Sequence, residues 1–199
     1  EVFLKNSKFW CAISTHKEED LFCLNTHLRV KQNHKNVKTI IIPRHIDRAK
    51  KIKIISEKLK LKTQILNINQ QIDNEKEIII VNSYGVISNY ISLCKSVFIG
   101  KSMIKRLKFV GGQNPIEAAK FGCKIYHGPY VYNFQEIYNQ LEKFGISFEV
   151  NNETELSNNL INDFLNFNKD NKNQLDTIHN LGKNILNETY NEISKINIE

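Results

Sequence analysis

The stretch Phe109-Val110-Gly111-Gly112-Gln113-Asn114-Pro115-Ile116-Glu117-Ala118-Ala119 decides the fold class of this chain. Two adjacent glycines allow the backbone to come close to another group. Asn114 is a favoured helix cap, Pro115 suits a first helical position, and Glu117 stands at the capping-box position. The start of a helix behind a glycine turn presents free backbone N–H groups to an anion. The stretch therefore predicts an anion site at a turn that leads into a helix.

Short apolar runs lie on both sides of this turn and recur along the chain between segments of helical periodicity. Such alternation indicates right-handed βαβ units and a parallel sheet flanked by helices. We predict strands over 8–13, 37–42, 63–66, 77–81, 97–99, 124–126 and 147–150, and helices over 18–31, 47–59, 86–94, 115–121, 134–144, 154–166 and 174–196. The predicted fold is thus α/β, a Rossmann-like doubly wound and mainly parallel sheet. We expect one domain over 1–199, with a C-terminal helical extension over about 153–199.

Composition narrows the class of protein further. The formal net charge of +7 favours anionic partners, although the lysines are scattered as they are on an ordinary surface. Cys11, Cys23, Cys94 and Cys123 form no CxxC pair, and we expect free thiols rather than a zinc site or a disulfide. No apolar run is long enough to span a bilayer. GxGxxG, GxxxxGK[ST] and GxSxG motifs and metal-ligand spacings are absent from the sequence.

The unusual residues collect in the loops after the predicted strands, which share one edge of a parallel sheet. These loops hold 14–19, 43–45, 82–85, 100–102, 111–117 and 127–136. The Arg44 guanidinium suits a phosphate or carboxylate because it offers a bidentate fork. Three pairs also have capping-box spacing and are equally explained as helix starts, namely Thr15 with Glu18, Asn114 with Glu117 and Asn133 with Glu136. Likewise, His16, Lys101 and Ser102 fit a solvated surface, and Tyr84-Gly85 fits a plain turn.

The ordered set of motifs resembles the C-terminal half of the Kdo transferases, which move 3-deoxy-D-manno-octulosonic acid (Kdo) from CMP-Kdo to a lipid A precursor. The resemblance covers about residues 9–165. It rests on Ser14-Thr15-His16 with Glu18-Glu19, Pro43-Arg44-His45 with Arg48, Tyr84-Gly85, Gly111 to Glu117, and Gly128-Pro129 with Asn133-Phe134. The chain departs from the family pattern at four places. Lys17 stands for a glycine, Asn82–Ile87 lacks two acidic residues, Lys101 replaces a second glycine, and Gln113 replaces a histidine.

The resemblance implies one lobe of a two-lobed GT-B glycosyltransferase of lipopolysaccharide biosynthesis. The nucleotide of the donor would contact Pro43, Arg44, Tyr84, Gly85, Gly111, Gly112, Asn114 and Glu117. The Kdo carboxylate would meet His16, Lys101 or Ser102. No metal or other cofactor is expected. The N-terminal lobe, with the acceptor site, the general base and any membrane anchor, is expected to be absent, so that the chain alone binds donor weakly and transfers nothing.

The same resemblance places the full-length protein at the cytoplasmic face of the bacterial inner membrane, and the fragment is expected to be soluble and to bind no nucleic acid. Two other functions remain open from the residues alone. The glycine turn with its helix and Glu117 fits another GT-B-like enzyme equally well, such as a UDP-sugar transferase or a UDP-GlcNAc epimerase. The positive charge also fits a module that binds nucleic acid or an anionic membrane.

Overall fold

The computed structural model describes residues 8–166 and scattered positions between 176 and 194. Seven strands form one sheet in the order β3-β4-β2-β1-β5-β6-β7, and every neighbouring pair is parallel. The strands are β1 (Phe9–Thr15), β2 (Lys38–Pro43), β3 (Thr63–Leu66), β4 (Ile78–Val81), β5 (Ser96–Ile99), β6 (Lys124–His127) and β7 (Ser147–Glu149). This confirms the doubly wound parallel sheet predicted from the alternating pattern.

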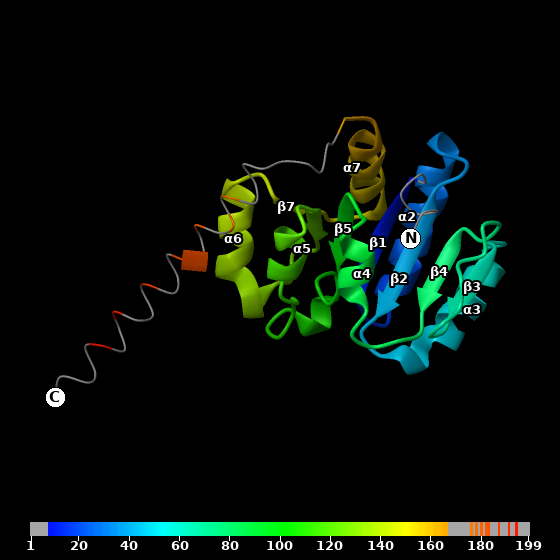
Figure 1. Cartoon of the computed structure of the whole chain (residues 1–199), viewed down its shortest axis with the longest axis horizontal. Helices are drawn as coiled ribbons and strands as arrows, with labels where there is room; N and C mark the ends of the chain where they lie inside the picture. Colours follow the sequence, from blue (N-terminus) through cyan, green and yellow to red (C-terminus); the bar gives the residue numbers. More distant parts are fainter. Residues whose placement is uncertain are drawn as a thin grey trace.

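Helices cover both faces of the sheet (Figure 1). One face packs against α4 (Ile87–Ile91), α5 (Ile116–Lys120) and α6 (Gln135–Lys143). The other packs against α2 (Glu19–Asn33), α3 (Ala49–Lys58) and α7 (Glu153–Asn166). Three 3-10 turns lie over Ile46–Arg48, Lys105–Leu107 and Tyr132–Phe134. The central strands are covered on both faces, which explains why β2 is a continuous run of buried residues.

Only one of the two helices predicted near the C-terminus can be compared with the structure. The helix predicted over 154–166 is α7, which packs against α2. The helix predicted over 174–196 lies for the most part outside the described residues. The four cysteines are buried thiols outside any disulfide, as expected for Cys11, Cys94 and Cys123 from the apolar runs in or beside which they stand.

A buried carboxylate fastens α7 to the sheet. Asp163 is 1% exposed and accepts hydrogen bonds from Ser96 Oγ at 2.8 Å and Tyr126 Oη at 2.6 Å. Its other oxygen meets Lys124 Nζ at 2.8 Å. Burial, together with the neighbouring Asp163 carboxylate, raises the pKa of Tyr126, so the phenol stays a neutral donor. This network joins α7 to β5 and β6.

Candidate functional site

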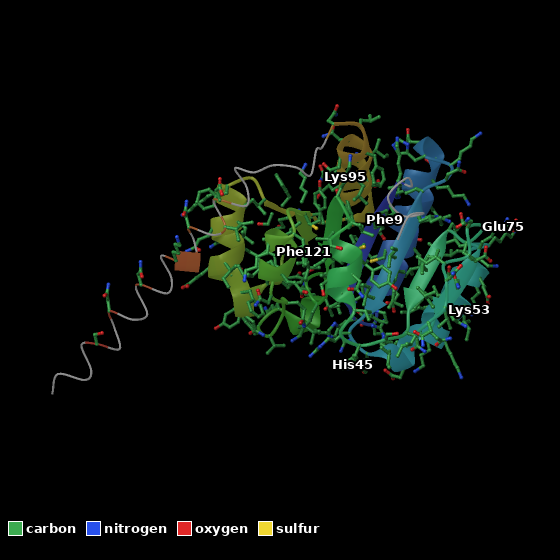
Figure 2. The ribbon with its side chains drawn as sticks, in the orientation of Figure 1. Phe9, His45, Lys53, Glu75, Lys95 and Phe121 are labelled. Carbon is green, nitrogen blue, oxygen red and sulfur yellow. The ribbon has the colours of Figure 1, made fainter. Side chains whose placement is uncertain are left out.

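The carboxyl ends of the strands lie at one edge of the sheet, which we call the carboxyl edge. Figure 2 shows His45, directly after β2, at this edge, and Phe9 and Lys95, which begin β1 and precede β5, at the opposite amino edge. Strand order reverses between β1 and β5, because β1 leads to β2 on one side and β5 leads to β6 on the other. Ligands of open α/β sheets bind in the crevice outside such a reversal.

The loops after β1 and β5 touch at this reversal. A Cβ on Gly100 would lie 2.6 Å from Thr15 Cα and 2.7 Å from the Ser14 carbonyl oxygen. Both distances are shorter than real Cβ contacts allow, so only glycine fits between the two strand ends. The two loops therefore act as one surface.

The carboxylate of Glu19 holds this surface together. It is 1% exposed and accepts four backbone hydrogen bonds. One oxygen accepts from the amides of His16 (2.9 Å) and Lys101 (2.7 Å), and the other from those of Ser102 (2.9 Å) and Met103 (3.0 Å). The side chain of α2 thus fills a nest of amides at the strand reversal. Sequence reasoning included Glu19 in a motif but gave it no role.

The capping box predicted for Thr15 and Glu18 is wrong. Glu18 has a φ of 88° and caps nothing with its side chain, which instead meets Arg106 at 3.0 Å on the surface. The box is formed one residue later, where Glu19 accepts from the His16 amide. Glu18 also has a left-handed backbone, a conformation that favours glycine. The glycine of the family pattern therefore corresponds to position 18 of this chain and not to Lys17.

The buried acid after Glu19 fixes the neighbouring loop. Asp20 is ion-paired with Arg48, whose guanidinium also donates to the Thr15 carbonyl oxygen at 2.7 Å. Burial raises the pKa of Asp20, while Arg48 acts in the opposite direction. Arg48, from the resemblance motif, is therefore a structural cation that ties the end of β1 to the turn after β2.

The diglycine turn is built for packing against the protein. Gly111 and Gly112 are buried, and a Cβ on Gly111 would lie 2.3 Å from the Tyr130 carbonyl oxygen. Gly112 has a φ of 89°, and its amide donates to the Lys101 carbonyl oxygen at 2.7 Å. The group that the two glycines approach is thus the chain itself. Lys101 also has a left-handed backbone, with a φ of 60°, which explains a family glycine at that position.

Asn133 anchors the diglycine turn and does not form the predicted capping box with Glu136. Its amide N–H donates to the Gly111 carbonyl oxygen at 3.1 Å and its side chain to that of Val110 at 3.0 Å. The helix that follows, α6, begins two residues later with no side-chain cap. The Asn133-Phe134 motif therefore holds the turn at the carboxyl edge.

Asn114 and Glu117 are exposed beyond this turn. Asn114 Oδ1 accepts from the Ile116 amide at 2.9 Å, which makes a local turn, and Asn114 and Glu117 do not cap one another. The helix α5 is five residues long and lies within the predicted range 115–121. Both side chains are exposed and can contact a ligand.

Arg44 and His16 lie together where β1 and β2 end. The Arg44 amide donates to the Thr15 carbonyl oxygen at 3.1 Å, and its exposed guanidinium has no hydrogen bond or ion pair among the described residues. The rings of His16 and His45 meet edge to face at 5.9 Å between centroids. Burial lowers the pKa of His16, although the Ser14 carbonyl and Glu19 oppose this. His16 is thus neutral near neutral pH, and its Nδ1–H is donated to the Ser14 carbonyl oxygen at 3.1 Å.

Ser102 does not fit the role predicted for it. It is fully buried, and its hydroxyl donates to the Ile99 carbonyl oxygen at 2.7 Å and accepts from the Gly128 amide at 2.8 Å. A sugar carboxylate has no access to this group, so Ser102 is a scaffold residue. Tyr84 and Gly85, after β4, are exposed, and β2 separates β4 from β1 in the sheet. Pro43 is buried at the end of β2, where it sets the direction of Arg44.

His127, at the end of β6, makes the fold sensitive to acid. Burial lowers its pKa to about 4, against a smaller effect of its hydrogen bond to the Gly128 carbonyl oxygen. In the unfolded chain the histidine has a pKa near 6.5. Between about pH 6.5 and pH 4 the unfolded state therefore binds a proton that the folded state does not, and the free energy of unfolding falls as the pH falls through that range. We expect a loss of about 2 kcal/mol between pH 7 and pH 5. Urea unfolding of wild type and His127→Gln checks it, because an equally steep loss in the variant would contradict the assignment.

Among residues 8–166 and the scattered positions after them, no group of three His, Cys, Asp or Glu side chains is arranged to hold a metal ion. No helix in the part of the chain that the structure describes combines the length and hydropathy needed to cross a bilayer.

Comparison with known proteins supports the resemblance. No family model matches the chain. The 3-deoxy-D-manno-octulosonic acid transferase of Aquifex aeolicus (strain VF5) is 29% identical over 149 residues, which cover 75% of this chain and 40% of that protein. The protein of the same name from Haemophilus influenzae (strain ATCC 51907 / DSM 11121 / KW20 / Rd) is 25% identical over 195 residues, 98% of this chain and 44% of that protein. The chain thus spans less than half the length of these curated relatives.

A solved structure has the same fold. The C-terminal CMP-Kdo binding domain of WaaA from Acinetobacter baumannii matches with a TM-score of 0.77 at 20% identity, over 89% of this chain and 90% of that one. The resemblance to Kdo transferases that the motifs predict is therefore confirmed, and the fold is that of one Rossmann-like lobe.

Proposed function

We propose that this chain is the donor-binding lobe of a Kdo transferase and that it binds CMP-Kdo at the carboxyl edge. The observation that carries the proposal is the likeness to Kdo transferases over 75% and 98% of the chain. The fold of a solved CMP-Kdo binding domain and the convergence of the motif residues on one edge support it.

The chemistry of transfer requires a fixed positive site at this edge. The bond between Kdo and the phosphate of CMP breaks as the acceptor hydroxyl attacks, and the leaving CMP takes up negative charge. Preorganised donors stabilise such charge. The free Arg44 guanidinium is the donor best placed for the phosphate, since Arg48 is held by Asp20 and Thr15. Lys101, at the centre of the reversal, is a cation that acts electrostatically on His16.

The remaining contacts follow from the same placement. Glu117 is exposed beyond the diglycine turn and would accept hydrogen bonds from the ribose hydroxyls. Tyr84 and Gly85 would border the cytosine. Lys101 would receive the Kdo carboxylate, and His16 would donate to it from Nε2 in its protonated form, since the single N–H of the neutral ring is used on the Ser14 carbonyl oxygen. The scaffold beneath these side chains is the Glu19 amide nest together with the Asn133 anchor.

The full activity needs more than this lobe. We propose that a separate N-terminal lobe binds the lipid A precursor and supplies the general base, so that this chain alone transfers no Kdo. The full-length protein would work at the cytoplasmic face of the inner membrane, without a metal ion, and this chain would be a soluble, single domain that binds no nucleic acid.

Calorimetric titration of the chain with CMP tests the site. Arg44→Ala is expected to weaken CMP binding about tenfold, because it removes a charged hydrogen bond to phosphate. Glu117→Ala is expected to weaken it by less, about threefold, since a ribose hydrogen bond is exposed to water. Arg29→Ala and Glu142→Ala, exposed residues away from the carboxyl edge, are the matched controls.

Two outcomes would contradict the proposal. Equal CMP affinity in wild type, Arg44→Ala and Glu117→Ala would remove the site assignment. Tighter binding of UDP than of CMP would favour a UDP-sugar transferase or epimerase in place of a Kdo transferase.

A further inference from the structure

The amino edge of the sheet carries a strongly basic hollow, far from the strand ends that form the donor site. Its volume is about 950 Å³. Its walls come from the turn between α2 and β2, the turn between α3 and β3, and the loop before β4, where Figure 2 labels Glu75. Seven lysines line it, against two glutamates, namely Lys8, Lys31, Lys35, Lys38, Lys60, Lys62 and Lys76 with Glu75 and Glu77.

The two glutamates leave most of this charge uncompensated. Glu77 lies between Lys31 and His27, with its second oxygen on the Lys62 amide at 2.8 Å. Glu75 reaches Lys62 only at 4.0 Å, and both side chains are largely exposed. Lys35 and Lys60 have no acidic partner among the described residues. These two exposed lysines therefore face the hollow from different turns as free cations.

The floor of the hollow adds a cation that is already out of water. Lys38 is 5% exposed, and its ammonium donates to the carbonyl oxygens of Asn74, at 2.8 Å, and of Lys76. An ammonium fixed in the wall of the hollow adds to the positive potential inside it, although the carboxylates of Asp73 and Glu77 also act on Lys38. Phosphate groups are the ligands that lysine clusters favour, because an ammonium is a compact point charge that suits a phosphate oxygen.

We propose that this lysine hollow is a second anion site, for a molecule that carries several phosphate groups, and that it is separate from the donor site. Its chemistry is shared by a soluble polyphosphorylated ligand and by the phosphate headgroups of a lipid surface. The site rests on residues of the amino edge alone and does not depend on the proposed transfer of Kdo. Scattered lysines on a surface would be solvated separately, whereas these meet around one cavity.

Titration of the full chain with sodium tripolyphosphate tests the proposal, with flotation on vesicles of phosphatidylcholine containing phosphatidylglycerol as the second arm. Amide shifts in NMR locate the binding. We expect shifts at Lys35 and Lys60, and a roughly tenfold weakening in the double variant Lys35→Gln/Lys60→Gln. The control Lys50→Gln/Lys51→Gln removes two exposed lysines of the α3 region that lie outside the hollow.

Each outcome decides the proposal. Tripolyphosphate binding that the hollow variant loses and the control keeps supports a soluble ligand, and the same pattern on vesicles alone supports a lipid headgroup. No binding in either arm, or equal weakening in both double variants, overturns the site. Failure here leaves CMP binding by Arg44 untouched, because that titration reports on the opposite edge.

Discussion

Replacing Glu19 with glutamine is expected to lower the free energy of unfolding by about 3 kcal/mol, because two buried amides lose their acceptor. The glutamine oxygen can replace only one carboxylate oxygen, and its NH2 group then faces two backbone donors. The loop from Gly100 to Met103 loses its fixed position, and the Lys101 carbonyl that holds Gly112 moves with it. We therefore also expect CMP affinity to fall at least tenfold, measured by calorimetry where the variant is folded.

The neighbouring acid provides the control for Glu19. Glu18 is 58% exposed at its side chain and meets Arg106 in a surface ion pair, so Glu18→Gln is expected to change stability by about 0.5 kcal/mol or less. Urea unfolding followed by circular dichroism compares the two variants with wild type. Equal stability of Glu19→Gln and Glu18→Gln would show that the amide nest does not hold the loops.

Replacing Asp163 with alanine is expected to lower the free energy of unfolding by about 3–5 kcal/mol, because it leaves a largely buried ammonium and two buried hydroxyls without their acceptor. The substitution removes the hydrogen bonds that join α7 to β5 and β6. Ser96 and Lys124 are the first residues of β5 and β6, so two of the three contacts lie at the amino ends of these strands. CMP affinity should therefore be unchanged at temperatures at which the variant is folded, in contrast to Glu19→Gln.

An exposed position on the same helix gives the control for Asp163. Asn162→Ala removes only a surface contact with Asn166 and is expected to change stability by about 0.5 kcal/mol or less. Thermal and urea unfolding measure both variants. A loss of CMP binding in folded Asp163→Ala would contradict the separation between the α7 anchor and the donor edge.

The sheet could be predicted because its information is local. Runs such as 37–42 and 77–81 are apolar at consecutive positions, which is typical of strands covered on both faces, and the intervening helices show their own period. The parallel direction of the strands could be predicted because each connection between them is long enough to hold a helix. Most strand and helix ends differ from the predicted ones by one or two residues, and α4 ends three residues earlier, since hydrogen bonds with neighbours decide where an element ends.

The candidate site could be predicted only in part, because partners from distant segments decide what each residue does. Capping-box spacing suggested Asn133 with Glu136, yet Asn133 bonds to the turn at Val110 and Gly111. Gly111 and Gly112 signalled a close approach correctly, but the sequence does not say that the approaching group is the chain itself. The buried role of Ser102 had no local signal at all.

Glu19 shows the same limit at the centre of the site. Three of its four donors are more than eighty positions away in sequence, so no local pattern reveals them. The sequence shows Glu19 only as an acid at the expected start of a helix, whereas the tight approach at Gly100 is visible only in the structure. The family resemblance included Glu19 in a motif but did not explain why an acid stands at that position.

A crystal structure of the chain with CMP tests the central claim most directly, namely that the loops at the carboxyl edge form the site for the cytidylate. The account predicts the CMP phosphate within hydrogen-bonding distance of the Arg44 guanidinium, with the ribose towards Glu117 and the amide nest of Glu19 unchanged beneath. CMP bound in the lysine hollow at the amino edge, with the Arg44 guanidinium still in solvent, would contradict it.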